Sequence, residues 1–242
     1  MKIIGVLMTY NCERVVQNAI DKIPKDEFDD IICSDDGSID NTLSIIKKNN
    51  IKFVQNHHTG YGGNLYAGMK KAFEMGATHV IELHGDGQYD FDQTPEMKKK
   101  FFENSDLVLG NRFHNYLQPF KDGMPLYIYF GNLFLTFLGR IGLGTMVNDL
   151  FQGFRGYSKK FFDTIDTSNM YKDYRFSFEV IVQAQFLSLK ISSIPVRCDY
   201  KSDHQSMPLK RAIPCIIHTV RTGIMYRLAK LGIRYSIFKK IN

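Results

Sequence analysis

The stretch "THVIELHGDGQYD", residues 78–90, joins an apolar run to an abrupt polar end. The run "THVIEL" has the composition of a strand, whereas glycines and oxygen-bearing side chains fill most positions from His84 to Asp90. Glycine lets another group approach the backbone closely, and carboxylate oxygens with no obvious partner favour a bound cation. The stretch is therefore either an acidic tight turn or a place that holds something positively charged.

Strand-like and helix-like stretches alternate on both sides of this one. We expect further strands at residues 2–10, 29–36, 51–56, 106–113 and 191–200, and helices at residues 14–23, 41–50, 62–76, 94–104 and 176–190. Such alternation is typical of an open, mostly parallel sheet that is flanked by helices and binds ligands beyond the carboxyl ends of its strands. The pattern predicts an α/β fold.

The composition indicates a soluble, cytoplasmic protein. Of 242 residues, 44% are hydrophobic and 23% are charged, which is enough apolar material for a packed core. The four cysteines have no C-x-x-C spacing, which favours reduced thiols in the cytosol over a zinc site. The N-terminal "MKIIGVLMTYN" has too short an apolar run for a signal peptide, so we expect it to form the first strand.

The net charge of +6 is unevenly distributed. Residues 26–40 are rich in acidic side chains, whereas the chain after Lys201 is strongly basic. This asymmetry favours an acidic cleft at one end and a phosphate-rich partner near the other. The sequence contains no recognition motif for nucleic acid, so nucleic acid is not expected among the partners.

The second half of the chain contains two unusually apolar helical segments. Residues 124–138 form an apolar stretch of about 15 residues, shorter than the roughly 20 that span a bilayer. A final helix is expected at residues 213–238, where Arg227, Lys230 and Arg234 flank one apolar stripe. A basic amphipathic helix can lie peripherally on the inner face of the membrane. Alternatively, the two segments pack on each other or form the contact of a homodimer.

Polar clusters follow three of the expected strands. They are "TYN" at residues 9–11, "SDDGSID" at 34–40 and "HGDGQYD" at 84–90. A single Asp-Gly pair is usually only a turn, but the carboxyl ends of parallel strands converge on one crevice. Oxygen ligands gathered in this way suit Mg²⁺ or Mn²⁺. The three clusters together predict a divalent-metal site.

These clusters and four further motifs resemble the ordered signature of family-2 glycosyltransferases. The further motifs are "NHHTGYGGNLYAGMKKA", "LGNRF", "QGFRGY" and "IPVRCDY". The likeness is greatest to the branch of dolichyl-phosphate-mannose synthase and its bacterial polyprenyl-phosphate relatives. It implies a GT-A type nucleotide-sugar-binding fold as the catalytic domain, residues 1–206, followed by a basic amphipathic helical segment, residues 207–242.

The resemblance implies a UDP- or GDP-linked sugar donor and a divalent metal, Mg or Mn. The donor-binding residues would be Thr9, Tyr10, Asn11, Asp35, Asp36, Gly60, Gly63, Asn64 and Gly85. Asp86 would be catalytic as a metal ligand, with Gln88 as a second ligand. His84 stands where the family usually has an acidic residue, and it is the candidate for a third ligand.

The resemblance also assigns residues to phosphate and acceptor. They are Arg112, Gly153, Phe154, Arg155, Lys201 and Ser206, and Asp149 precedes the "GFR" segment. The implied reaction is one displacement that inverts the anomeric carbon, with Arg112 stabilising negative charge. A polyprenyl phosphate acceptor is already an anion and needs no base, whereas a hydroxyl acceptor would need Asp149 as general base.

Two alternatives lie outside this family activity. A nucleotidyltransferase would share the sheet and the metal, but it would need a glycine-rich basic loop where "TYNCER" follows the first strand. A non-catalytic nucleotide-sugar-binding module is favoured only by the histidine at position 84.

Overall fold

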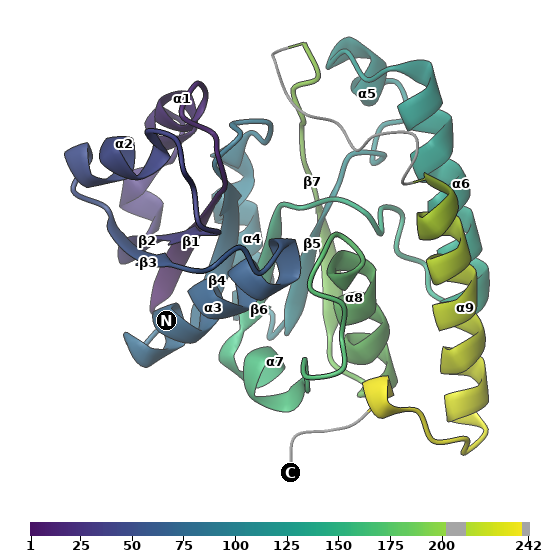
Figure 1. The fold of residues 1–242 in the computed structure, drawn as a ribbon. Coiled ribbons are helices and arrows are strands. Elements are labelled where there is room, and N and C mark those ends of the chain that lie inside the picture. The colour runs from purple at the N-terminus through teal and green to yellow at the C-terminus, as the bar shows by residue number, and fades with distance from the viewer. Residues whose placement is uncertain (202–211, 239–242) are drawn as a thin grey trace.

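The computed structural model describes residues 1–201 and 212–238, and these form one open seven-stranded sheet with helices on both faces (Figure 1). The strand order is β3-β2-β1-β4-β6-β5-β7. β6 runs antiparallel to both of its neighbours, and the other pairs are parallel. The strands are β1 Ile3–Thr9, β2 Asp30–Asp35, β3 Lys52–Gln55, β4 His79–His84, β5 Leu107–Asn111, β6 Arg155–Ser158 and β7 Ile191–Pro195.

Strand β1 lies in the middle of the parallel half, and all seven of its residues are buried. A strand covered on both faces is expected to be apolar throughout, as "IIGVLMT" is. In the register of the sheet, Met8 lies opposite His84 and Thr9 lies opposite Asp35. The ends of β1, β2 and β4 therefore meet at one edge, which confirms the predicted convergence of the three polar clusters.

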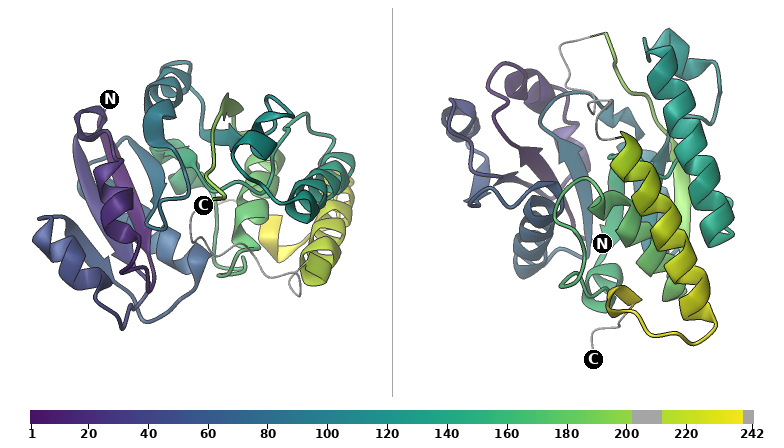
Figure 2. Two further views of the ribbon diagram at one scale, coloured as in Figure 1. Left: turned by 90° about the horizontal axis from the view of Figure 1, so that it is seen from above. Right: turned by 45° about the vertical axis from the view of Figure 1, so that its right-hand side comes forward.

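Helices cover both faces of the sheet (Figure 2). Helices α3 and α8 pack on one face and helices α1, α2 and α4 on the other. The helices are α1 Val16–Asp21, α2 Thr42–Lys48, α3 Tyr61–Glu74, α4 Thr94–Phe102, α5 Gln118–Lys121, α6 Leu126–Leu143, α7 Lys159–Thr164, α8 Phe176–Phe186 and α9 Ala212–Lys230. Single 3-10 turns occur at Lys25–Glu27, Phe91–Gln93 and Ser236–Phe238.

Helices α6 and α9 lie side by side at the β7 end of the molecule (Figures 1 and 2). They touch where Gly142 meets Gly223, and a Cβ built on either residue would lie 2.9 Å from the Cα of the other. Tyr129, Leu135 and Leu143 of α6 and Tyr226 of α9 are buried, but many other apolar residues of the two helices face outward. We call the apolar face the set of side chains that are at least 41% exposed: Leu126, Tyr127, Phe130, Phe134, Phe137 and Ile141 of α6, and Ile213, Ile217, Val220 and Ile224 of α9.

The structure changes three expectations for the second half of the chain. The last helix ends at Lys230 instead of residue 238, because Gly232 takes a φ of 98° and the chain turns back to bury Phe238. Helix α6 has 18 residues, and among the described residues it is the one helix long and apolar enough to cross a membrane. Strand β6, within "QGFRGYS", was not predicted.

Helix α3 packs so closely on β1 that adding one methyl group at the contact should lower the stability of the fold. A Cβ on Gly68 would lie 2.4 Å from Cγ1 of Val6, so Gly68→Ala should lower the free energy of unfolding by about 1–3 kcal/mol. Urea denaturation measures this change. Gly131→Ala in α6 is the control, because nothing lies within 4 Å and alanine favours helix by up to about 1 kcal/mol. Equal behaviour of the two variants would contradict the close packing of α3.

Candidate donor and metal site

The turn after β4 is held against the end of β1. The Gly85 backbone N–H donates to the Met8 carbonyl at 2.9 Å. A Cβ at position 85 would lie 2.8 Å from that oxygen, so a side chain there would push the turn away. The turn that carries Asp86 and Gln88 is thereby fixed at the edge of the sheet where a ligand is expected. We call this turn, residues 85–88, the metal turn after its predicted role.

Asp86 and Gln88 provide the oxygen donors of this turn. Oδ1 of Asp86 accepts a hydrogen bond from the Gln88 backbone N–H at 2.9 Å, which closes the turn. An anionic and a neutral oxygen ligand suit Mg²⁺ or Mn²⁺, which keep further positions for water and phosphate oxygens. Within the described residues, no three His, Cys, Asp or Glu side chains are grouped to hold a metal. The chemistry of the two side chains fits a divalent cation that shares its coordination with a bound diphosphate, and their roles as ligands stay a prediction.

The Nε2 atom of His84 is engaged inside the protein. Its Nε2 lies 2.9 Å from Oε1 of Glu82 and 3.2 Å from the Gly153 carbonyl, and Glu82 is wholly buried. Burial would lower the pKa of His84, but the hydrogen bond to Glu82 and the charge of Glu82 raise it above its usual value. Because Nε2 already has these two partners, the structure gives no support for metal binding by this atom. The role of His84 as a third ligand stays a prediction.

Asp35 is wholly buried and holds the loop after β2. Its Oδ1 accepts from the hydroxyls of Thr9 at 2.8 Å and Ser38 at 2.6 Å. Its Oδ2 accepts from the backbone N–H groups of Gly37 and Ser38. Because both oxygens are engaged inside the protein, this geometry gives Asp35 and Thr9 a structural role, and their predicted contact with the donor stays a prediction.

Asp36 holds the loop before α3, residues 57–60, which we call the donor loop after its predicted role. Its carboxylate accepts from the backbone N–H groups of Thr59 at 2.6 Å and Gly60 at 3.0 Å. Gly60 has a φ of 83°, a conformation that favours glycine. Nδ1 of His58 lies 3.1 Å from the same carboxylate, and the His58 ring stacks on Tyr10 at 4.5 Å between centroids. Tyr10, which follows β1, is about half exposed, and its predicted contact with the donor stays a prediction.

Three further predicted donor residues brace these loops. Oδ1 of Asn11 accepts from the Ile39 backbone N–H at 2.9 Å. The Asn64 side chain is buried and donates to a β2 carbonyl at 2.9 Å. The Gly63 backbone N–H donates to the Lys172 carbonyl at 3.4 Å. The structure thus brings all the predicted donor residues to one edge, although many of their polar groups already bind the protein.

Arg112 and Asp149 form a buried ion pair. Nε and Nη2 of Arg112 donate to the two carboxylate oxygens of Asp149 at 2.7 and 2.9 Å. Arg112 is 7% exposed and Asp149 is 1% exposed. Nη1 of Arg112 donates to the Tyr200 hydroxyl at 2.8 Å. Each side chain is therefore occupied by the other in a bidentate pair. To contact a phosphate, Arg112 would have to share its donors, and to act as a base, Asp149 would have to give up hydrogen bonds.

The "GFR" segment does not expose the side chains that were predicted to line the acceptor side. Arg155 is fully buried and donates to the backbone carbonyls of Gln152 at 2.7 Å and Ser177 at 2.6 Å. Phe154 is also fully buried and packs in the core between the sheet and α4. Gly153 accepts from His84 through its carbonyl. Arg155 and Phe154 instead hold the loop that approaches the metal turn.

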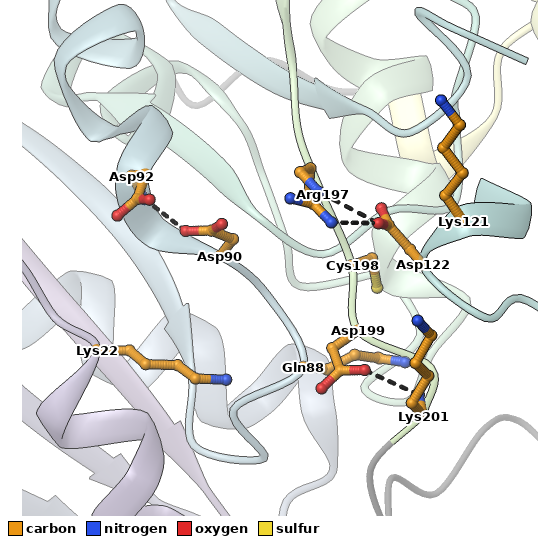
Figure 3. A pocket seen from close by; sticks show the side chains of 10 residues that line it. All are labelled: Lys22, Gln88, Asp90, Asp92, Lys121, Asp122, Arg197, Cys198, Asp199 and Lys201. Carbon is orange, nitrogen blue, oxygen red and sulfur yellow. Dashed lines mark hydrogen bonds and ion pairs between the residues drawn. The ribbon is translucent and has the colours of Figure 1, made fainter. Parts of the chain in front are cut away.

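A polar pocket of about 390 Å³ opens beside Gln88 (Figure 3). Lysines from different parts of the chain, Lys22, Lys121 and Lys201, line it. An Arg197–Asp122 ion pair of 2.6 Å forms part of its wall. Lys201 lines this pocket, and its predicted phosphate contact stays a prediction, whereas Ser206 falls outside the described residues.

Comparison with known proteins agrees with the motif signature. Residues 6–166 match glycosyl transferase family 2. The chain belongs to that family. It is therefore a glycosyltransferase, and the non-catalytic alternative is set aside.

Two archaeal relatives resemble this family-2 glycosyltransferase over most of its length. A UDP-N-acetylglucosamine–dolichyl-phosphate N-acetylglucosaminyltransferase of Methanococcus voltae is 30% identical, over 81% of this chain and 84% of the relative. A dolichyl-phosphate hexose transferase of Haloferax volcanii is 22% identical, over 79% of this chain and 80% of the relative.

Solved structures show that the fold of this family-2 glycosyltransferase is shared. Glucosyl-3-phosphoglycerate synthase of Mycobacterium tuberculosis, in complex with Mn²⁺, UDP and glucosyl-3-phosphoglycerate, superposes with a TM-score of 0.66 over 97% of this chain and 81% of that one. At 18% sequence identity this likeness concerns the fold, which confirms the predicted GT-A architecture.

The sequence motifs missed one residue at the base of the site of this family-2 glycosyltransferase. Glu82 lies within β4 and accepts hydrogen bonds from the hydroxyls of Tyr61 at 2.6 Å and Tyr157 at 2.9 Å. Burial and the charge of Glu82 raise the pKa of both tyrosines well above the usual range. The sequence does hold one indication of this residue, a glutamate inside the apolar run "VIEL". Charged side chains are rarely buried without partners, so a glutamate in a buried strand indicates polar contacts inside the protein.

The Arg112–Asp149 pair predicts a stability effect. Asp149→Asn would leave a buried guanidinium without its counter-charge, so the free energy of unfolding should fall by about 3–5 kcal/mol. Asp163→Asn, which breaks an exposed ion pair with Lys159, is the matched control and should cost less than about 1 kcal/mol. Urea denaturation compares the two. Similar small losses would mean that the buried pair does not stabilise this region.

Proposed function

We propose that this family-2 glycosyltransferase transfers a sugar from a UDP- or GDP-linked donor to a polyprenyl phosphate, with inversion at the anomeric carbon. The nucleotide would bind at the ends of β1 and β2, against Tyr10 and the loop that Asp36 holds. The names of the two archaeal relatives include dolichyl phosphate, which supports the class of acceptor.

Asp86 and Gln88 would hold the divalent cation. When bound, such a cation supplies Lewis-acid stabilisation of the negative charge on the departing diphosphate. Gly85 lets the turn sit against β1, so that both side chains stay at the strand ends where the diphosphate is expected.

The observation that carries the choice of acceptor is the ion pair of Asp149. A hydroxyl acceptor needs a carboxylate that can take a proton, but Asp149 is 1% exposed and both of its oxygens bind Arg112. A phosphate acceptor is an anion already and requires no base. Lys121 and Lys201, in the pocket beside Gln88, would bind it directly, although Asp90, Asp92, Asp122 and Asp199 line the same pocket.

The apolar face of α6 and α9 supports peripheral attachment to the inner face of the membrane. Its ten side chains belong to two helices that pack together, and on the proposed reading the two apolar stripes would act as one surface. Exposed apolar patches of this extent mark interaction sites, and Arg221 and Lys230 on α9 would attract anionic headgroups. A homodimer through the same face is the competing occupant.

Transfer itself tests the proposed function. Wild-type protein should move labelled sugar from UDP- or GDP-linked donors into an organic phase that contains short-chain polyprenyl phosphate, and EDTA should prevent this. Asp86→Ala should reduce transfer by about 100-fold or more, because the anionic ligand is lost. Gln88→Ala should lose roughly tenfold.

Exposed Asp163→Asn controls for nonspecific effects and should keep wild-type activity. Transfer to a hydroxyl acceptor but not to the lipid phosphate would overturn the assigned acceptor. Full activity of Asp86→Ala would overturn the assigned metal site.

Co-sedimentation tests membrane attachment. The protein should pellet with vesicles of phosphatidylglycerol and phosphatidylcholine at low salt, and 1 M NaCl, at which the Debye length is about 3 Å, should weaken the binding. Serine at Phe130, Phe134, Ile217 and Ile224 together should abolish pelleting, because each side chain is at least 50% exposed on the apolar face.

The matched control is Phe102→Ser, which removes an apolar side chain that is 72% exposed on α4. It should pellet like the wild type. A wild-type protein that stays in the supernatant and sediments as a dimer would assign the apolar face to a second copy.

A further inference from the structure

Glu82 is a buried carboxylate that joins three elements around the site. Oε1 accepts from the hydroxyl of Tyr61 at 2.6 Å and faces Nε2 of His84 at 2.9 Å. Oε2 accepts from the hydroxyl of Tyr157 at 2.9 Å. Tyr61 is the first residue of α3, directly after the donor loop, and His84 is the last residue of β4, directly before the metal turn. One oxygen of Glu82 therefore links the two segments that hold the donor and the cation.

The link has a geometric consequence for position 84. Residues 82 and 84 are two apart in a strand, so their side chains lie on the same face of the sheet. The Nε2 of His84 is also within reach of the Gly153 carbonyl at 3.2 Å, and a Cβ on Gly153 would lie 2.6 Å from this nitrogen. The imidazole is thus held from two sides, and a carboxylate in its place would meet the negative charge of Glu82.

We infer that Glu82 is a positioning residue, which holds the donor loop through Tyr61 and the metal turn through His84, and that His84 serves in this link and not as a metal ligand. The inference rests on the proposed function only for the identity of the bound group, a nucleoside diphosphate with a divalent cation. It explains how a histidine can occupy a position where the family usually has an acidic residue.

Substitutions at position 84 separate a positioning role from a ligand role. Gln can place its amide nitrogen where His has Nε2, so His84→Gln should keep the affinity for Mn²⁺–UDP or Mn²⁺–GDP within threefold of the wild type. His84→Ala should lose about tenfold or more, as partners that orient metal ligands typically contribute. His84→Asp should lose at least as much, since the new carboxylate faces Glu82. Calorimetric titration of the nucleotide with Mn²⁺ measures these affinities without turnover.

The double variant Glu82→Gln/His84→Asp provides the decisive comparison. Removing the charge at position 82 should restore most of the Mn²⁺–nucleotide affinity lost in His84→Asp, and it should raise the melting temperature of the metal-free protein relative to that single variant. Non-additive effects of this kind identify residues that act through each other. If His84 is instead a ligand, His84→Asp alone should bind Mn²⁺ more tightly than the wild type, and that result would overturn the inference.

Tyrosine variants test the link to the donor loop. Tyr61→Phe should weaken binding of Mn²⁺–nucleotide about tenfold, whereas Tyr157→Phe, which removes a hydrogen bond to the other oxygen of Glu82 from β6, should stay within twofold. Equal losses in both variants would mean that Glu82 only stabilises the core, and would overturn the inference. If wild-type protein binds the Mn²⁺–nucleotide but transfers no sugar to any acceptor, the proposed function fails while the inference about Glu82 still stands.

Discussion

The parallel pairing of β1 with β2 and β4 is the constraint on which the site depends. Hydrogen bonding in this register sets the end of β1 opposite the ends of both neighbours, so three polar segments from distant parts of the chain arrive together. A shift of one residue would turn the side chains of β4 to the opposite face of the sheet. Glu82 and His84 would then exchange places with core residues. The apolar side chains of β1, packed between two layers of helices, therefore also fix the chemistry at its end.

Much of the fold could be predicted from the sequence, because the parallel half has strong local signals. Long apolar strands and amphipathic helices follow one another, and their periods differ clearly. Strand β6 lacked such a signal: it has four residues, "RGYS", and it is a strand because β4 and β5 offer hydrogen bonds on both sides. The end of α9 was also missed, since the apolar spacing continues through Leu231 to Phe238 while Gly232 breaks the helix.

The candidate site shows a different limit of sequence reasoning. Motifs identified which residues gather at the strand ends, but not how many of their polar groups are already engaged. Asp35 and Asp149 are both acidic residues near a ligand edge, and both carry a full set of internal partners. Whether a carboxylate binds a ligand or its own protein depends on groups such as Ser38 and Arg112, whose distances only the folded chain defines. Glu82 was missed because its partners Tyr61 and Tyr157 lie 21 and 75 residues away in the sequence, so no local motif includes them.

The reversed direction of β6 has a consequence for how the site is assembled. In a parallel sheet, ligand-binding loops follow their strands, but the amino end of an antiparallel strand reaches that same edge. The segment that precedes β6 therefore supplies Gly153 to the vicinity of His84. Strand β6 also separates β4 from β5 by two strand spacings, roughly 10 Å. Asp86 after β4 and Arg112 after β5 are thus held apart by the width of one strand. The two turns that were predicted to meet the donor and the acceptor are therefore spaced by the strand between them, and the segment before β6 lies at the same edge.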